Sequence, residues 1–242
     1  MAAPLTTVVI PVKNEAHETL VKLLYDLDQH GYPVILVDDG STTPVVGADI
    51  RFDPPGRGYG AALKAGIDKA STDLVVTMDG DGQHTAWDVK RLEDFFCYFA
   101  TSWKPGLGRA RLDMVVGDRR LVEKSLLRFL GRKSLNWLAS LFAGRYINDL
   151  NSGLRIFRRS IALSYQPILC DTFSFTTSLT LAMIADGYNV DFLPVKVGIR
   201  KTGVSHVKLW HDGWVTLKYI CWIGFACRTR NLRAMLRRWR FA

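Results

Sequence analysis

The first eighty residues alternate between strand and helix patterns, and this alternation constrains the fold more than any other feature of the chain. Runs rich in β-branched residues predict strands over residues 6–12, 32–41 and 73–79, with a weaker strand over 49–52. Helical patterns separate them, one with leucines on a single face and one that begins at about Tyr59. Strands that alternate with helices form parallel βαβ units. The sequence therefore predicts an α/β fold with a mostly parallel central sheet flanked by helices.

The second half of the chain continues this organisation. A further strand is predicted over residues 114–120, followed by a basic helical stretch that runs to Gly144. Residues 147–157 predict a loop and a strand, and residues 173–200 predict a helix and a strand. Because no repeat or low-complexity linker interrupts these patterns, we expect one α/β domain over residues 1–210.

Polar residues follow each of the three strongest early strands. They are Lys13 to Glu15 after the first strand, Asp38 and Asp39 after the second, and Asp79 to Asp81 after the third. In open α/β sheets, ligands bind outside the carboxyl ends of the strands. We therefore expect the three turns to converge on one crevice.

Asp79 and Asp81 stand one residue apart in this last turn. Residues i and i+2 of an extended segment point the same way, so both carboxylates can aim at one point. Two nearby carboxylates repel unless they share a proton or a cation. Gly80 and Gly82 make the turn open rather than apolar, which favours a hard divalent cation, Mg²⁺ or Mn²⁺, with positions left for substrate phosphates. The alternatives are a proton-sharing pair and a solvated acidic turn.

A bound cation would bridge the diphosphate of a nucleotide and stabilise it as a leaving group. Glu15, Asp38 and Asp39 are then suited to accept hydrogen bonds from ribose hydroxyls or base amines. Their alternative role is that of ordinary turn and helix-cap residues.

The stretch GRGYGA, residues 56–61, matches a loose dinucleotide-binding fingerprint with Asp79 about twenty residues further on. Pro54 and Pro55 separate it from the weak strand, and Asp81 would repel a dinucleotide phosphate in the absence of metal. We therefore expect these glycines to let a helix begin close to the sheet.

The net charge of +9 is concentrated near the C-terminal end, where residues 201–242 contain nine Lys or Arg and one acid. The stretch Trp214–Cys227 is apolar and aromatic, but its fourteen residues rise only about 21 Å as a helix, short of a hydrocarbon core. We predict that residues 211–242 form an apolar-then-basic helical segment that lies on an anionic membrane surface. The alternative is a core helix followed by a solvated basic tail.

The four cysteines form no Cys-x-x-Cys pair, and no secretory signal opens the chain. These features predict a cytoplasmic location, peripheral at the cytoplasmic face of a membrane. A basic nucleic-acid-binding protein is a remote alternative. We expect no nucleic acid partner, because the charge lies outside the predicted fold and no recognition module is present.

Six short motifs follow one another along the chain. They are IPVKNE (Ile10–Glu15), VDDGS (Val37–Ser41), DGDGQH (Asp79–His84), VVGDRR (Val115–Arg120), DLNSGLR (Asp149–Arg155) and GIRKTGVSHVK (Gly198–Lys208). Over roughly residues 5–210, their order resembles the family 2 glycosyltransferases of GT-A fold. The resemblance is to the branch of dolichyl-phosphate mannose synthases and related polyprenyl-phosphate sugar transferases.

The resemblance implies roles for individual residues. The metal would be held by Asp79, Asp81 and Gln83. The donor nucleotide sugar would meet Pro11, Lys13, Glu15, Asp38, Asp39, Asp79, Arg200 and Ser205. The catalytic set would comprise Asp79, Asp81, Arg119, Arg128, Asp149 and Arg200, with Arg119 and Arg128 placed where the family binds the lipid phosphate.

The family chemistry is inverting: an acceptor phosphate oxygen attacks the anomeric carbon, and a nucleoside diphosphate leaves. A phosphate is already anionic and needs no strong base, so catalysis would rest on positioning and electrostatics. The runner-up is a saccharide or other hydroxyl acceptor, for which Asp149 is the candidate base. Lys13 stands where the family has a tyrosine, and the choice between a GDP-linked and a UDP-linked donor stays open.

Overall fold

The computed structural model describes residues 5–101, 111–119, 126–198 and 209–229. Within these residues, seven strands form one sheet in the order β3-β2-β1-β4-β6-β5-β7. The strands are β1 (Thr6–Val12), β2 (Val34–Asp38), β3 (Ile50–Arg51), β4 (Leu74–Thr77), β5 (Met114–Arg119), β6 (Arg155–Arg158) and β7 (Val190–Val195). Among these seven described strands, β6 alone runs antiparallel to its neighbours, β4 and β5, and the other pairs are parallel. The predicted mostly parallel α/β sheet is confirmed.

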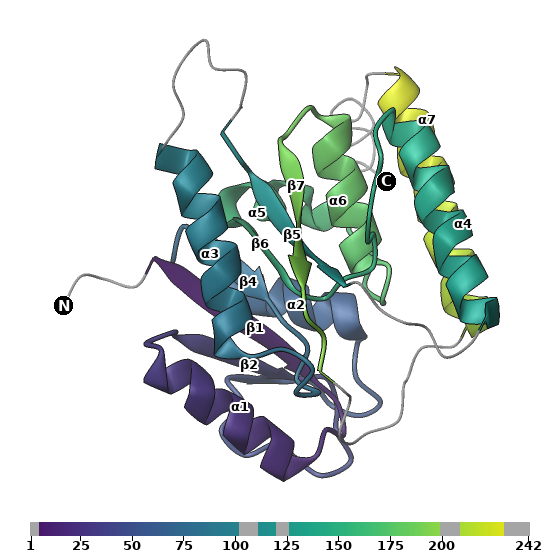
Figure 1. Ribbon diagram of the computed structural model, residues 1–242. Helices are drawn as coiled ribbons and strands as arrows, with labels where there is room; N and C mark the ends of the chain where they lie inside the picture. The colour runs from purple at the N-terminus through teal and green to yellow at the C-terminus, as the bar shows by residue number, and fades with distance from the viewer. Residues whose placement is uncertain (1–4, 102–110, 120–125, 199–208, 230–242) are drawn as a thin grey trace.

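Helices cover both faces of this sheet (Figure 1). They are α1 (His17–Gln29), α2 (Tyr59–Lys69), α3 (Ala86–Thr101), α4 (Leu126–Ala143), α5 (Arg159–Tyr165), α6 (Phe175–Ala185) and α7 (Leu209–Thr229), with a short 3-10 helix over Gln166–Ile168. Because successive strand residues point to opposite faces, Val8 and Ile10 of β1 pack under α1 and α3, whereas Val9 packs with α2, α5 and α6. The sheet is therefore buried on both sides.

The element boundaries follow the sequence patterns closely in the first half of the chain. The strand expected over residues 6–12 is β1, and the helix expected from about Tyr59 is α2. Helix α3 was not among the predicted elements, although a buried stripe of Val89, Leu92 and Phe96 marks its inner face.

Helix α7 packs against α4 and α6 and closes a third, smaller core. Ile220 and Ile223 are fully buried in it, and a Cβ on Gly224 would lie 2.4 Å from the Phe142 ring, so glycine allows the two helices to approach closely. The inner face of α7 thus belongs to the packed body of the protein. Among the described helices, none is both long enough and apolar enough to cross a membrane.

Candidate functional site

The carboxyl ends of β2, β1 and β4 lie next to one another, because these strands are parallel neighbours in the sheet. The turns after β1 and β2 are joined directly: the Asn14 N–H donates to Ser41 Oγ at 2.9 Å, and the Thr42 N–H donates to Asn14 Oδ1 at 2.8 Å. Asn14 adopts a positive φ of 55°, a conformation that asparagine tolerates. The first two motifs therefore form one rigid edge.

Asp38 is fully buried and organises the turn that follows it. Its carboxylate accepts hydrogen bonds from the Ser41 N–H at 2.8 Å and the Val45 N–H at 3.1 Å. Burial works to raise the pKa of Asp38, but these hydrogen bonds and the nearby Arg51 guanidinium hold it below its usual value. Asp38 thus shapes the backbone of the site as an anion.

Asp39 likewise accepts backbone hydrogen bonds, in its case from the glycine-rich stretch before α2. Its Oδ1 accepts hydrogen bonds from the Arg57 N–H at 2.7 Å and the Gly58 N–H at 2.9 Å. These N–H groups lie just before α2, where the phosphate of a dinucleotide would accept hydrogen bonds from a helix N-terminus. The Asp39 carboxylate accepts their hydrogen bonds in place of such a phosphate. Gly60 allows α2 to begin against the backbone of residues 170–172, where a Cβ would lie 2.1 Å from the Cys170 carbonyl oxygen.

The other predicted donor residues lie along the same edge. Pro11 is buried in β1 opposite Val37 of β2, and Glu15 is half-buried in the turn after β1. Lys13 Nζ donates to the Pro55 carbonyl oxygen and so joins the first turn to the loop before α2. Their contact with a nucleotide stays a prediction.

Asp79 is held from two sides. The Tyr59 hydroxyl donates to Asp79 Oδ1 at 2.8 Å, and the Tyr59 ring stacks on Phe173 with centroids 5.1 Å apart. Burial, and then the Asp79 charge, raise the pKa of Tyr59 far above its usual value, so it remains a phenol donor. On the other side, a Cβ added to Gly153 would lie 2.4 Å from Asp79 Oδ2, so only glycine leaves room for the carboxylate.

Asp81 completes the acidic pair and is 6% exposed. Its Oδ1 accepts a hydrogen bond from the Gln83 N–H at 3.1 Å, which turns the chain back after the motif. The described residues hold no group of three or more His, Cys, Asp or Glu side chains suited to a metal. An acidic pair of this kind suits a hard divalent ion, which takes oxygen ligands and keeps positions for substrate oxygens.

Gln83, the third predicted metal ligand, connects the motif to the end of β7. Its Nε2 donates to the Gly198 carbonyl oxygen at 3.2 Å, and the Gly198 N–H donates to the Gln83 carbonyl oxygen at 2.9 Å. Arg200 and Ser205, which follow Gly198, lie outside the described residues. Arg128 lies in α4, but its side chain is likewise outside the described set.

Arg119 at the end of β5 forms a bidentate ion pair with Asp149. Arg119 Nε lies 2.7 Å from Asp149 Oδ2, and Nη2 lies 3.1 Å from Oδ1. Burial would raise the pKa of Asp149, but Arg119, together with Arg132, lowers it below its usual value. Burial would lower the pKa of Arg119, yet Asp149 and also Asp79 raise it. The mutual influence of Arg119 and Asp79 places this pair in the same electrostatic field as the acidic motif.

Arg155 is a residue that the sequence interpretation did not single out. It is completely buried, and it donates to the Ser152 carbonyl oxygen at 3.1 Å, the Thr176 carbonyl oxygen at 2.8 Å and Thr180 Oγ1 at 2.8 Å. Burial lowers its pKa to about 10. These bonds fix the loop that carries Asp149 and Gly153. The motif DLNSGLR contains the arginine, but sequence alone does not distinguish a loop brace from a phosphate ligand.

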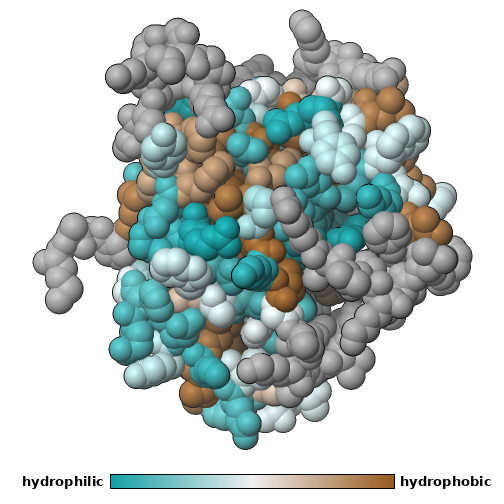
Figure 2. Space-filling view, viewed as in Figure 1, coloured by the Kyte–Doolittle hydropathy of each residue, from teal (hydrophilic) through white to brown (hydrophobic). Residues whose placement is uncertain are grey.

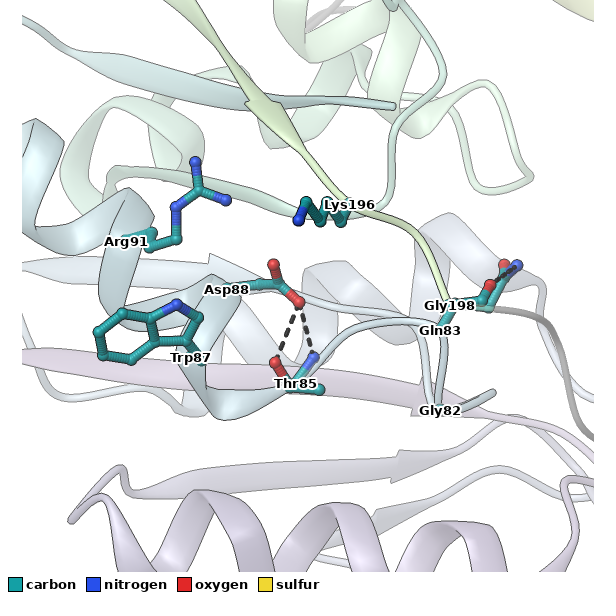
Figure 3. A pocket seen from close by; sticks show the side chains of 8 residues that line it. All are labelled: Gly82, Gln83, Thr85, Trp87, Asp88, Arg91, Lys196 and Gly198. Carbon is teal, nitrogen blue, oxygen red and sulfur yellow. Dashed lines mark hydrogen bonds between the residues drawn. The ribbon is translucent and has the colours of Figure 1, made fainter. Parts of the chain in front are cut away.

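A cleft of about 860 Å³ opens beside the acidic motif (Figure 3). It is lined by Gly82, Gln83, Thr85, Trp87, Asp88, Arg91, Lys196 and Gly198. Figure 3 shows Arg91 and Lys196 above Asp88, whose carboxylate accepts both hydrogen bonds from Thr85, at 3.0 and 3.1 Å. The lining of the cleft therefore contains two cations together with Gln83. His84, beside it in sequence, is buried, and burial lowers its pKa.

Comparison with known proteins shows that the chain is similar to sugar transferases. Residues 7–102 match the model of Glycosyl transferase family 2. The chain is 26% identical over 225 residues to the polyprenol monophosphomannose synthase of Mycolicibacterium smegmatis, which covers 83% of this chain and 80% of that protein. It is 34% identical over 148 residues to the dodecaprenyl-phosphate galacturonate synthase of Rhizobium johnstonii, which covers 54% of this chain and 40% of that protein.

A solved structure has the same fold. Glucosyl-3-phosphoglycerate synthase from Mycobacterium tuberculosis, in complex with Mn²⁺, uridine diphosphate and phosphoglyceric acid, superposes with a TM-score of 0.64. The match covers 90% of this chain and 78% of that one, at 17% sequence identity.

Proposed function

The chain carries a family 2 glycosyltransferase domain on a GT-A fold, and from this premise we propose that it transfers a sugar from a nucleotide-diphosphate donor to a polyprenyl phosphate. The donor is GDP- or UDP-linked, and the reaction inverts the anomeric centre. The relatives support the acceptor class, since two of them are synthases whose names join a sugar to a polyprenyl phosphate.

The donor end of the proposed site rests on the two carboxylates after β4. We propose that Asp79 and Asp81, with Gln83, hold Mg²⁺ or Mn²⁺. Bound there, the cation would neutralise the diphosphate as it leaves. Tyr59 and Gly153 support this role because they hold the Asp79 carboxylate in one orientation. Pro11, Lys13 and the turns after β1 and β2 would receive the nucleoside.

The observation that carries the acceptor class is the ion pair between Arg119 and Asp149. Asp149 is 1% exposed, both its oxygens face Arg119, and its pKa is lowered, so it is a poor base for a sugar hydroxyl. An acceptor phosphate needs no base, and Arg119 has further N–H groups with which to bind it. We assign Asp149 the positioning of Arg119, and we keep Arg128, Arg200 and Ser205 as proposed phosphate and donor contacts.

We also propose that the protein works at a membrane surface, because a polyprenyl phosphate is held in the membrane by its lipid chain. The cytoplasmic face of that membrane is part of the proposal and rests on the predicted cytoplasmic location. In this proposal residues 1–210 form the transferase domain and residues 211–242 contribute to membrane attachment. The basic charge of residues 201–242 supports attraction to anionic lipid.

Release of nucleoside diphosphate tests the proposed reaction. Purified protein is incubated with Mg²⁺ or Mn²⁺, a panel of GDP- and UDP-sugars, and undecaprenyl or dolichyl phosphate in detergent. We expect release with one donor only when the lipid phosphate is present, and a loss of at least about 100-fold in Asp79→Asn and Asp81→Asn. The matched control is Asp28→Asn, an exposed acid on α1. Release that depends on a saccharide hydroxyl, and not on lipid phosphate, would refute the acceptor assignment.

A further inference from the structure

We propose that Asn136 of α4 is a positioning residue for the acceptor site: it holds the backbone on both sides of Asp149, and through Asp149 it orients Arg119. The inference rests on the proposed function for its purpose, which is the binding of an acceptor phosphate by Arg119. Asn136 lies outside the six sequence motifs, so its connection to the site comes from the fold.

The side-chain amide of Asn136 binds two peptide groups of the loop that follows α4. Its Nδ2 donates to the Asn148 carbonyl oxygen at 2.8 Å, and its Oδ1 accepts a hydrogen bond from the Leu150 N–H at 3.4 Å. These groups belong to the residues immediately before and after Asp149. Because an amide carries a donor and an acceptor together, one side chain holds both peptide groups at once.

Ser140, one turn further along α4, supports the same arrangement. Its Oγ donates to the Asn136 carbonyl oxygen at 2.7 Å and accepts a hydrogen bond from the Ile147 N–H at 2.9 Å. Leu150 is fully buried, so its N–H needs an acceptor within the protein, and Asn136 supplies one. Two neighbouring polar side chains of α4 therefore hold the backbone of the loop.

Apolar packing places this loop but does not orient its peptide groups. Ile147 and Leu150 are buried in the core that α4 shares with α6 and α7. Figure 1 shows the loop running back beside α4, and Figure 2 shows hydrophilic residues along this part of the surface. Burial of apolar surface has no preferred direction, whereas a hydrogen bond fixes the direction in which a peptide group points. The two bonds of Asn136 therefore set the direction of the Asp149 side chain.

The direction of Asp149 matters because its carboxylate contacts Arg119 at two points. Arg119 Nε lies 2.7 Å from Oδ2 and Nη2 lies 3.1 Å from Oδ1, a paired geometry that requires the two planar groups to face each other edge to edge. The Arg119 backbone N–H also donates to Asp149 Oδ2, at 3.3 Å. A rotation of the Asp149 backbone would break this geometry, and Arg119 would no longer be held where the acceptor phosphate is proposed to bind.

Hydrogen exchange at Arg119 Nε, followed by ¹⁵N NMR of the full-length protein, tests this positioning without turnover. Asn136→Leu keeps the branched side-chain skeleton of asparagine and removes both polar groups. Ser134→Ala is the matched control, because it removes a side-chain bond that stays within α4, from Ser134 Oγ to the Leu130 carbonyl oxygen at 2.8 Å. The reference in the same spectra is the Arg159 Nε–H, which donates to the Ile67 carbonyl oxygen at 2.8 Å.

We expect the Arg119 Nε–H to exchange at least about tenfold faster in Asn136→Leu than in Ser134→Ala, because its bond to Asp149 opens more often. The Arg159 Nε–H should exchange at an unchanged rate in both variants. Ser140→Ala removes the neighbouring support alone and should accelerate exchange at Arg119 to a smaller degree, and it replaces Asn136→Leu if that variant does not fold. Thermal unfolding shows which variants are folded.

Kinetics add a second measurement, in the assay that follows release of nucleoside diphosphate. Asn136→Leu should raise the KM for the lipid phosphate at least about tenfold and leave the KM for the nucleotide sugar unchanged. The reason is that the proposed donor contacts lie in the turns after β1, β2 and β4, away from the bonds of Asn136. A residue that only stabilised the fold would not separate the two substrates.

Equal exchange of the Arg119 Nε–H in Asn136→Leu and Ser134→Ala would overturn the proposal. Equal acceleration at Arg119 and Arg159 would also overturn it, because it would show a general loss of stability. The same holds if the KM for the nucleotide sugar rises as much as the KM for the lipid phosphate. The exchange measurement contains neither donor nor acceptor, so it decides the role of Asn136 separately from any failure of the proposed reaction.

Discussion

Replacing Tyr59 by phenylalanine removes one hydroxyl and keeps the ring that stacks on Phe173. The lost bond is the 2.8 Å hydrogen bond to Asp79 Oδ1, a bond to a charged acceptor that contributes about 1.5–3 kcal/mol. Without it, the Asp79 carboxylate is fixed on one side only, by the close approach of Gly153. Loss of such a supporting bond weakens metal binding about 10- to 100-fold. We expect Tyr59→Phe to bind Mn²⁺ about tenfold more weakly in the presence of the nucleoside diphosphate.

The paramagnetic signal of free Mn²⁺ gives this affinity without turnover. Tyr165→Phe is a closely matched control, because the Tyr165 hydroxyl donates at 2.6 Å to Asp186, at the C-terminal end of α6, whereas Phe173, which stacks on Tyr59, precedes the N-terminal end of this helix. Both variants should lose comparable stability in urea, since each loses one tyrosine–aspartate bond. Equal Mn²⁺ affinities in Tyr59→Phe and Tyr165→Phe would refute the argument that Tyr59 orients the carboxylate for metal.

Three further predictions follow from the same contacts. Gly153→Ala should reduce Mn²⁺ affinity more than Tyr59→Phe does, because the added methyl occupies the space of Asp79 Oδ2; the same titration measures it. Asp149→Asn should lower the free energy of unfolding by about 3 kcal/mol in urea, because it leaves the Arg119 charge without its buried partner. The pKa of Asp149 is lowered in the folded state, so the ion pair stabilises the protein at pH values above the ordinary carboxyl pKa. This stabilisation is lost as the pH falls through the folded-state pKa. The free energy of unfolding of Asp149→Asn should therefore fall less steeply below about pH 4 than that of the unmodified protein. Arg155→Met should keep the sheet but destabilise the protein by about 3 kcal/mol in urea, because the buried Ser152 carbonyl oxygen loses its donor and the Thr176 carbonyl oxygen keeps only the Thr180 hydroxyl as a side-chain donor.

Local patterns carry those parts of the fold that depend on neighbours in the chain. The run of β-branched residues locates β1 to the residue, and the parallel order of β2, β1 and β4 brings their polar turns to one edge as expected. The joint aim of the Asp79 and Asp81 carboxylates stays a prediction, because β4 ends at Thr77 and the chain turns at Gly80 and Asp81. The strand positions could be predicted because each rests on a local sequence pattern.

The supports of the pair could not be predicted, because they depend on the register of distant strands. Strand β6 runs antiparallel to β4 with Thr77 opposite Arg155. Continued by two residues, this register sets Asp79 opposite Gly153, which is why the motif glycine meets the carboxylate. The short sequence of β6 predicts neither the direction of this strand nor the strand with which it pairs. The hydrogen bond from Tyr59 to Asp79 depends in addition on the position of α2.

Asp39 shows how a sequence interpretation and a structural role can both apply to one side chain. Sequence reasoning offered nucleotide contact and backbone capping as alternatives, and the structure shows capping, with hydrogen bonds from the Arg57 and Gly58 N–H groups. A carboxylate has about four acceptor positions, so these bonds leave capacity for a ribose hydroxyl. Capping also fixes the direction of those remaining positions before a ligand arrives, which reduces the entropy lost on binding. The backbone bonds of Asp39 are therefore a precondition for the proposed nucleotide contact and not evidence against it.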